Sequence, residues 1–173
     1  MMTGGIGMMI VGIGFKLAVV PFHMWTPDIY EGASSPVSAF IASASKSAVM
    51  AVLIRFFIMA DLWHFERITA VFTAVAVTTM LFGNLLALLQ NNVKRLLAYS
   101  SVAHFGYALV PLISGRTAGP EATTFYVITY VIAILGAFGL ITVFSRGKEE
   151  AATISDYRGL FWKKPVLSTV FSF

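Results

Sequence analysis

The chain has 173 residues, of which 58% are hydrophobic and only 12% are charged, and its mean hydropathy is +0.83. Soluble domains carry roughly 25% charged residues, so the composition excludes an ordinary soluble domain and indicates a polytopic membrane protein. Cysteine is absent, which excludes disulfides, thiolate zinc sites and cysteine-ligated iron–sulfur clusters. The net charge of +4 comes mostly from basic residues between apolar segments, so we expect these residues to orient helices and expect no nucleic-acid partner.

The first predicted span covers residues 1–23 and is apolar apart from one threonine and Lys16. It also carries several glycines and meets Pro21 near its end. Glycine and proline weaken a straight helix, and membrane helices tolerate a break only where protein or water satisfies the freed backbone groups. We therefore expect a break near Gly12 to Lys16. The polar sequence YEGASSP that follows is predicted to be an interfacial turn.

Four more apolar runs, each bounded by polar residues, predict further membrane-spanning helices. In the second span serines alternate with alanines, and Gly136 and Gly139 lie in the fifth; such small residues let helices approach closely. The whole chain, residues 1–173, is thus predicted to be one all-α domain, a polytopic transmembrane helix bundle of about five full spans plus a truncated sixth. The spans after the first are residues 36–59, 68–90, 93–113 and 122–145, and the truncated sixth begins at 165–173.

Basic residues are unequally divided between the two sets of loops. The loops after the first, third and fifth spans carry seven, and the other loops, with the end of the second span, carry three. The positive-inside rule therefore places the first set in the cytoplasm. The tryptophans all fall at predicted helix ends, as an interfacial aromatic belt would have them. The seven basic residues are Lys94, Arg95, Arg146, Lys148, Arg158, Lys163 and Lys164; the three are Arg55, Arg67 and Arg116; the tryptophans are Trp25, Trp63 and Trp162.

Lys46 is the strongest candidate for a functional residue because it lies deep inside an apolar span. At about 1.5 Å per residue it lies roughly 15 Å beyond Pro36, near the middle of a bilayer core, and its side chain reaches neither interface. Charge at that depth costs several kcal/mol, so such residues normally line a polar interior and mark ion or proton pathways. If the first two spans form an antiparallel pair, Lys16 faces Lys46 at similar depth. Lys16 precedes His23 by only seven residues, so a surface position for its ammonium stays equally open.

His104 is the third candidate, and it follows Lys94 by ten residues, which gives it about the depth of Lys46. Histidine binds and releases protons near neutral pH, so it could relay protons between the lysines, or it could be a core residue satisfied by a neighbour. We read the adjacent Lys94 and Arg95 as interface anchors. The predicted proton pathway therefore comprises Lys16, Lys46 and His104, and no catalytic, metal-ligating or cofactor-binding residues are predicted.

Three stretches of sequence match one known pattern: FHMWTPDIYEGASSPVSAFIASASK (22–46), FGNLLALLQNNVKRLLAYSSVAHFGY (82–107) and SDYRGLFWKKP (155–165). The chain resembles the subunit N family of antiporter-like membrane subunits of proton-pumping NADH–quinone oxidoreductase, respiratory complex I. The other antiporter-like subunits and the multisubunit cation/proton antiporters share KRLLAYSS and the PD…PVS core. The YEG and SASK elements favour subunit N.

The resemblance implies a larger bundle of inverted repeats, each with a discontinuous helix, of which this chain supplies a central portion. Lys16 matches the family's key lysine beside the first helix break, and Lys46 matches the neighbouring relay lysine. The glutamate partner expected for Lys16 and the last lysine of the family's pathway both lie on helices outside this sequence. The chain is therefore expected to be a fragment.

The function implied is proton translocation coupled to electron transfer from NADH to quinone, with no redox chemistry in the chain itself. NADH, flavin, iron–sulfur clusters and quinone belong to the complex. The expected partners are other membrane subunits of complex I, the lipid bilayer and, through the complex, quinone, and the expected location is the bacterial inner membrane as a multi-pass protein. Two alternatives stay open: a non-conducting membrane scaffold or assembly fragment, and a subunit of a multisubunit cation/proton antiporter.

Overall fold

The computed structural model of the chain describes residues 2–145, 153–159 and 162. These residues are helical or in turns, with no β-strand among them, as predicted for an all-α protein. The predicted sixth span at 165–173 and most of the preceding loop lie outside the described residues. The helices are α1 (Met2–Leu17), α2 (Trp25–Gly32), α3 (Ser35–Phe40), α4 (Lys46–Ala60), α5 (Glu66–Leu88), α6 (Val93–Ser114) and α7 (Ala118–Phe144), with a π-helical turn at Ile41–Ser45 and 3-10 turns at Leu62–His64 and Ile154–Tyr157.

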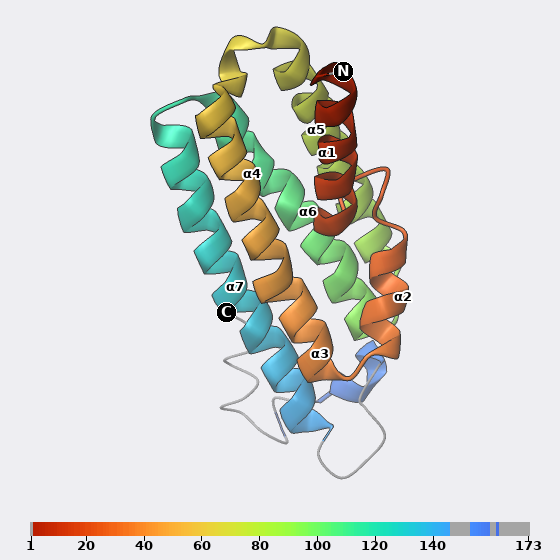
Figure 1. The fold of residues 1–173 in the computed structure, drawn as a ribbon. Helices are drawn as coiled ribbons and strands as arrows, with labels where there is room; N and C mark the ends of the chain where they lie inside the picture. Colours follow the sequence, from red (N-terminus) through yellow and green to blue (C-terminus); the bar gives the residue numbers. More distant parts are fainter. Residues whose placement is uncertain (1, 146–152, 160–161, 163–173) are drawn as a thin grey trace.

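In the described part of the chain, four helical segments are long and apolar enough to cross a membrane, rather than the five predicted. They are Ser35–Ala60, Glu66–Leu88, Val93–Ser114 and Ala118–Phe144. The difference lies at the first segment, where the apolar helix over Gly7–Leu17 is too short to span alone. Figure 1 shows the long helices side by side, with α1 above α2 along one flank of the bundle.

The first segment is broken, but the break lies at residues 18–24, after Leu17, and not at Gly12 to Lys16 as predicted. The predicted residues lie within the unbroken helix α1. Ala18 has a φ of 59°, in the left-handed region, which ends the helix. Pro21 then lacks the N–H that a helix needs and its ring clashes with the preceding turn. Several glycines in α1 are compatible with helix, so they are weaker breakers than this proline.

Side chains from two other places satisfy the backbone groups that the break frees. The N–H of Val20 donates to Thr79 Oγ1 on α5 at 3.0 Å, and the indole Nε1 of Trp25 donates to the carbonyl of Phe15 at 3.1 Å. The Trp25 ring also stacks on Phe15, with ring centroids 5.6 Å apart. Trp25 therefore closes the break between α1 and α2, and its place in an interfacial belt stays a prediction.

Helices α5 and α6 pack closely against each other. A Cβ at Gly83 would lie 2.7 Å from the backbone nitrogen of Ala103, and one at Gly106 would lie 2.9 Å from that of Met80. Only glycine allows the two backbones to approach this closely. Gly136 and Gly139, which were predicted to make such a contact, have open space at the Cβ position among the described residues, so that prediction is wrong for this part of the chain.

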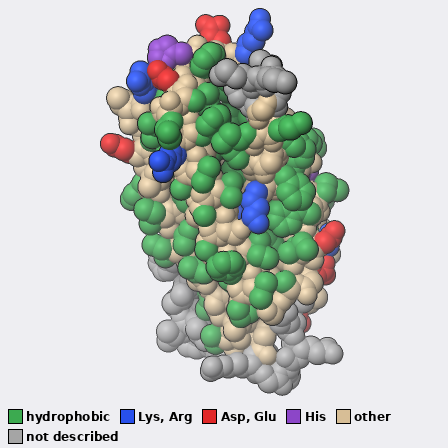
Figure 2. Space-filling model, in the orientation of Figure 1, with side chains coloured by type: hydrophobic (Ala, Val, Ile, Leu, Met, Phe, Trp, Pro, Cys, Tyr) green, Lys and Arg blue, Asp and Glu red, His purple; other side chains and the backbone are tan. Residues whose placement is uncertain are grey.

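The loops separate into two groups at opposite ends of the bundle (Figure 1). At one end, Glu31 lies beside Asn92, and the N–H of Ile154 donates to the carbonyl of Asn91 at 3.0 Å. At the other end, Arg116 pairs with Asp61 at 3.2 Å. Figure 2 shows hydrophobic side chains over most of one face, with charged side chains gathered toward its upper end. The predicted orientation requires the loops after the first, third and fifth predicted spans to lie at one end, and the structure groups them in this way. Which end faces the cytoplasm stays a prediction.

Candidate functional site

Lys46 is buried in the middle of the segment Ser35–Ala60, with a relative exposure of 1%. It is the first residue of α4 and follows directly on the π-helical turn Ile41–Ser45. Such turns are rare and occur frequently at functional sites. The ammonium Nζ of Lys46 donates to Ser101 Oγ on α6 at 2.8 Å. Lys46, which the sequence places deep in a span, therefore lies inside the bundle and is hydrogen-bonded to a side chain of another helix.

Aromatic rings and hydroxyls surround the Lys46 ammonium. Nζ lies 5.3 Å from the ring centroid of Phe105 and 5.8 Å from that of Tyr30, which are distances for cation–π contact. The hydroxyl of Tyr30, on α2, lies 3.4 Å from Ser101 Oγ. Tyr130, on α7, packs its ring 5.2 Å from that of Phe105, and its hydroxyl donates to the carbonyl of Ala42 at 3.3 Å. Helices α2, α4 and α6 thus meet around one serine hydroxyl, and α7 adjoins them through Tyr130. We call Lys46, Ser101, Tyr30, Phe105 and Tyr130 the lysine site.

The lysine site holds no carboxylate among the residues that the structure describes. The ion pairs in the described chain lie elsewhere: they join Asp28 and Glu31 to Arg95, and Asp61 to His64 and Arg116. Burying a cation without a counter-ion is costly, and a single hydroxyl with ring faces offsets only part of that cost. The arrangement is therefore poor for a permanent charge and suited to a group that can lose its proton.

His104 lies on α6 one turn beyond Ser101 and is half-buried. Its Nδ1 is 2.7 Å from the hydroxyl of Tyr126 on α7, and its ring centroid is 5.3 Å from that of Tyr130. The Tyr130 ring also packs on Phe105, whose ring faces Lys46, so His104 borders the lysine site through Tyr130. Which ring nitrogen of His104 carries the proton depends on the tautomer.

Lys16 does not join the lysine site. Its side chain is exposed on the outer surface of α1, two positions before the break, whereas Lys46 is buried. The helix α1 packs against α4, so the two lysines lie on adjacent helices but do not share an interior in the described chain. The choice between a pathway position and a position at the membrane surface stays a prediction for Lys16.

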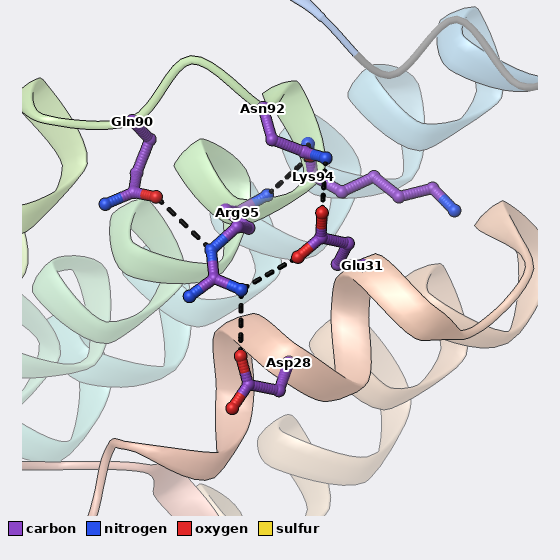
Figure 3. Close-up of polar contacts among 6 residues, drawn as sticks. All are labelled: Asp28, Glu31, Gln90, Asn92, Lys94 and Arg95. Atoms are coloured by element: carbon purple, nitrogen blue, oxygen red, sulfur yellow. Dashed lines mark hydrogen bonds and ion pairs between the residues drawn. The ribbon is translucent and has the colours of Figure 1, made fainter.

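A second polar cluster lies nearer the end of the bundle and joins α2 to α6 (Figure 3). Arg95 Nη1 bonds to Asp28 Oδ1 at 2.8 Å and to Glu31 Oε2 at 2.7 Å, and its Nε bonds to Gln90 Oε1 at 3.3 Å. Asn92 donates to Glu31 Oε1 at 2.9 Å and caps the start of α6 through its side-chain oxygen. We call Asp28, Glu31, Gln90, Asn92 and Arg95 the charge cluster.

Lys94 and Arg95, which were predicted to be interface anchors, make contacts within the bundle. Arg95 is partly exposed and binds two carboxylates of α2, so it holds two helices together. Lys94 is only 2% exposed, and its Nζ donates to the carbonyl of Ala33 in the turn between α2 and α3 at 2.8 Å. Both basic residues therefore connect α6 to α2 or to the turn that follows α2, and their role as interface anchors stays a prediction.

Sequence reasoning missed the aromatic and hydroxyl members of the lysine site. Tyr30 was assigned to an interfacial turn, but it lies in helix α2 and is fully buried. Ser101 and Tyr130 carried no signal of their own, because a serine or tyrosine in an apolar span is common. The one usable signal was that Tyr30 and Ser101 both fall within the long motifs of the resemblance.

The fold and the site together define a class: a multi-pass helical membrane protein with a broken helix and a titratable lysine buried in its bundle. A family profile described as NADH:quinone oxidoreductase/Mrp antiporter, TM, matches residues 1–173. The chain belongs to this family.

Individual relatives agree with that assignment. NADH-quinone oxidoreductase subunit N of Ectopseudomonas mendocina is 53% identical over 96% of this chain. A chain of respiratory complex I from Thermus thermophilus is similar in structure, with a TM-score of 0.77, 37% identity and 94% of this chain covered. A chain of an archaeal membrane-bound sulfane sulfur reductase has a TM-score of 0.82 at 26% identity, also over 94% of this chain. The chain spans about a third of the length of these relatives, with 34%, 35% and 34% covered.

Proposed function

We propose that this chain is a central part of subunit N of a proton-pumping NADH–quinone oxidoreductase and takes part in proton translocation driven by electron transfer from NADH to quinone. The observation that carries the proposal is Lys46, an ammonium buried among hydroxyls and rings with no carboxylate partner in the described chain. Burial disfavours the charged form of a lysine, so small changes in the surroundings can make such a group take up or release a proton. The 53% identity to a subunit N supports the choice of complex.

Within this function, Lys46 and His104 are neighbouring stations of a proton pathway. Ser101 contacts Lys46 and Tyr130 contacts His104, and their hydroxyls can take part in rearranged hydrogen bonds. Lys16 is the third station. Its exposed position on α1 is explained if helices of the longer protein cover that surface and bring a carboxylate to it, since the relatives are about three times as long as this chain.

The membrane arrangement follows from the same proposal. Helices α1 and α2 together form one discontinuous span, the first in the chain, which makes five with the four long helical segments. The fold is a portion of a larger inverted-repeat bundle. The chain carries no redox centre, and other subunits of the complex hold NADH, flavin, iron–sulfur clusters and quinone. Its partners are the other membrane subunits and the lipid of the bacterial inner membrane. The end of the bundle that bears Glu31 and Asn91 faces the cytoplasm, because the loops at that end carry more basic residues.

The decisive experiment replaces Lys46 with alanine in a full-length subunit N that has the same residues at the matching positions. Membrane-potential generation in reconstituted vesicles, at matched complex content, should fall by more than about tenfold, which corresponds to about 1.4 kcal/mol or more. Assembly should persist, because alanine removes a buried charge that has no carboxylate partner in the described chain. Arg55→Ala is the matched control, since Arg55 is an exposed basic residue on the same helix, and it should leave the potential unchanged.

Two alternatives give different results in that experiment. A non-conducting scaffold would generate the parent potential in both variants, and that outcome would refute the proposal. A cation/proton antiporter, which the family description also includes, would exchange cations for protons without NADH. Proton movement in vesicles driven by a sodium gradient alone would favour that second function.

A further inference from the structure

Ser101 occupies a position at which the hydrogen bonds of three other residues converge. Its hydroxyl is fully buried, accepts from Lys46 Nζ at 2.8 Å and donates to the carbonyl of Ala98 at 2.9 Å. The hydroxyl of Tyr30 approaches the same oxygen at 3.4 Å. A serine hydroxyl has one donor and two acceptor positions, so these contacts can occupy all of them at once.

We infer that Ser101 is a positioning residue for Lys46, which holds the side-chain nitrogen in place in both of its protonation states. The inference rests on the proposed function, because it assigns the group that makes the buried lysine usable as a proton carrier. When Lys46 is an ammonium, Ser101 accepts from it and donates to Ala98, which is the arrangement in the structure.

When Lys46 is a neutral amine, its nitrogen has a lone pair and needs a donor. The Ser101 hydroxyl then turns its hydrogen from the Ala98 carbonyl to Lys46 Nζ, while Tyr30 donates to the serine oxygen. The carbonyl of Ala98 keeps its place in helix α6. The lysine proton itself passes to or from the rest of the pathway, so Ser101 rotates a bond and never carries an extra proton.

Few other titratable groups lie around Lys46. Helix α2 contributes Tyr30, α7 contributes Tyr130, and α6 contributes His104 one turn beyond Ser101. Helix α1, which packs against α4, carries Lys16 with its side chain exposed. No carboxylate of the described residues pairs with Lys46, so Ser101 is the strongest acceptor placed to stabilise the ammonium.

The test measures the pH dependence of membrane-potential generation in the complete complex, with the full-length subunit. Ser101→Ala removes the acceptor of the ammonium, so Lys46 should bind its proton less tightly. The alkaline limb of the pH profile should then move to lower pH by about one unit, which is about 1.4 kcal/mol. Ser101→Cys keeps the volume with a much weaker acceptor and should shift the profile in the same direction. Ser101→Thr retains the hydroxyl and should keep the parent profile.

Controls separate the inference from packing and from the proposed function. Ser100→Ala changes the adjacent, half-buried serine on the same helix and should leave the profile unmoved. If Lys46→Ala abolishes the potential while Ser101→Ala and Ser101→Cys both keep the parent profile, the inference is overturned and the proposed function stands. An equal shift in Ser101→Thr would also overturn it, because the hydroxyl would not be the operative group. A parent potential in Lys46→Ala would instead overturn the proposed function, and the role of Ser101 with it.

Discussion

The charge cluster and the lysine site both include contacts between α2 and α6, but the cations in them have different partners. In the charge cluster, Arg95 is partly exposed and has two carboxylates within 2.8 Å. In the lysine site, Ser101 lies six residues after Arg95 on α6. There the buried Lys46 contacts the Ser101 hydroxyl and two ring faces. The contact of α2 with α6 thus includes Arg95, which has two carboxylate partners, and adjoins Lys46 of α4, which has none among the described residues.

Under the proposed function, the difference separates contacts that fasten two helices from a group that handles protons. Arginine stays protonated at any accessible pH and binds carboxylates with a rigid fork, so it suits a permanent contact between helices. Lysine can lose its proton when it is buried, and a fixed carboxylate beside it would favour the charged form and oppose that loss. The ion pairs of Arg95 therefore lie where solvent reduces the cost of burying charge. Lys46 lies where no carboxylate of the described chain reaches it.

The largest expected effect tests whether proton release, rather than positive charge, is what the lysines provide. In the full-length subunit, Lys16→Ala and Lys16→Arg should both reduce membrane-potential generation by more than about tenfold, at matched complex content. Arginine keeps the charge but cannot release the proton, so it should not rescue. Full activity in Lys16→Arg would mean that a fixed charge suffices, as it does in the charge cluster, and the distinction between the two regions would fail for Lys16.

A smaller effect is expected at His104, which borders the lysine site through Tyr130. His104→Gln keeps a polar group beside Tyr126 but does not titrate, so proton pumping should slow severalfold while uncoupled quinone reduction stays near the parent rate. Both rates are measured on the same vesicle preparation. If neither changes and the complex assembles normally, His104 is a core residue and the pathway does not include it.

Arg95 should affect stability instead of pumping. Arg95→Gln breaks contacts to Asp28 and Glu31, and because these groups are partly exposed the loss should be only about 1 kcal/mol. The thermal midpoint of the purified complex should fall, while potential per assembled complex stays within about twofold of the parent. Arg116→Gln, which breaks a more exposed pair with Asp61, should lower the midpoint less. A loss of pumping without a loss of stability would place Arg95 in the pathway.

No functional effect is expected from single cysteines used to map the two ends, and the chain has no native cysteine to interfere. A cysteine at position 91 should react with an impermeant reagent from the cytoplasmic side, and one at position 63 from the other side. Labelling of both positions from the same side would contradict the orientation and also the separation of the loops in the fold.

Local chemistry determined much of this protein from its sequence. Long apolar runs with few charges can only be satisfied as helices in a bilayer, so the helical class and the long spans were predictable. Lys46 was recognisable because a cation ten residues inside such a run has no route to water. The charge cluster and the exact break were not predictable in the same way: Pro21 indicated an interruption, but its position depended on the conformation of Ala18 and on Thr79 and Trp25, which satisfy the freed backbone groups.

The contacts that define the two regions were decided by tertiary structure alone. Lys46 and Ser101 are 55 residues apart in the chain, and Asp28 and Arg95 are 67 apart. Helical periodicity relates residues within a turn or two, so it carries no information about which face of α2 meets which face of α6. Close packing of α5 on α6 at Gly83, together with the break that tilts α2 onto α6, sets that meeting. The sequence therefore determined that a cation is buried, and only the packing of the helices decided that a serine hydroxyl, and no carboxylate of the described chain, receives it.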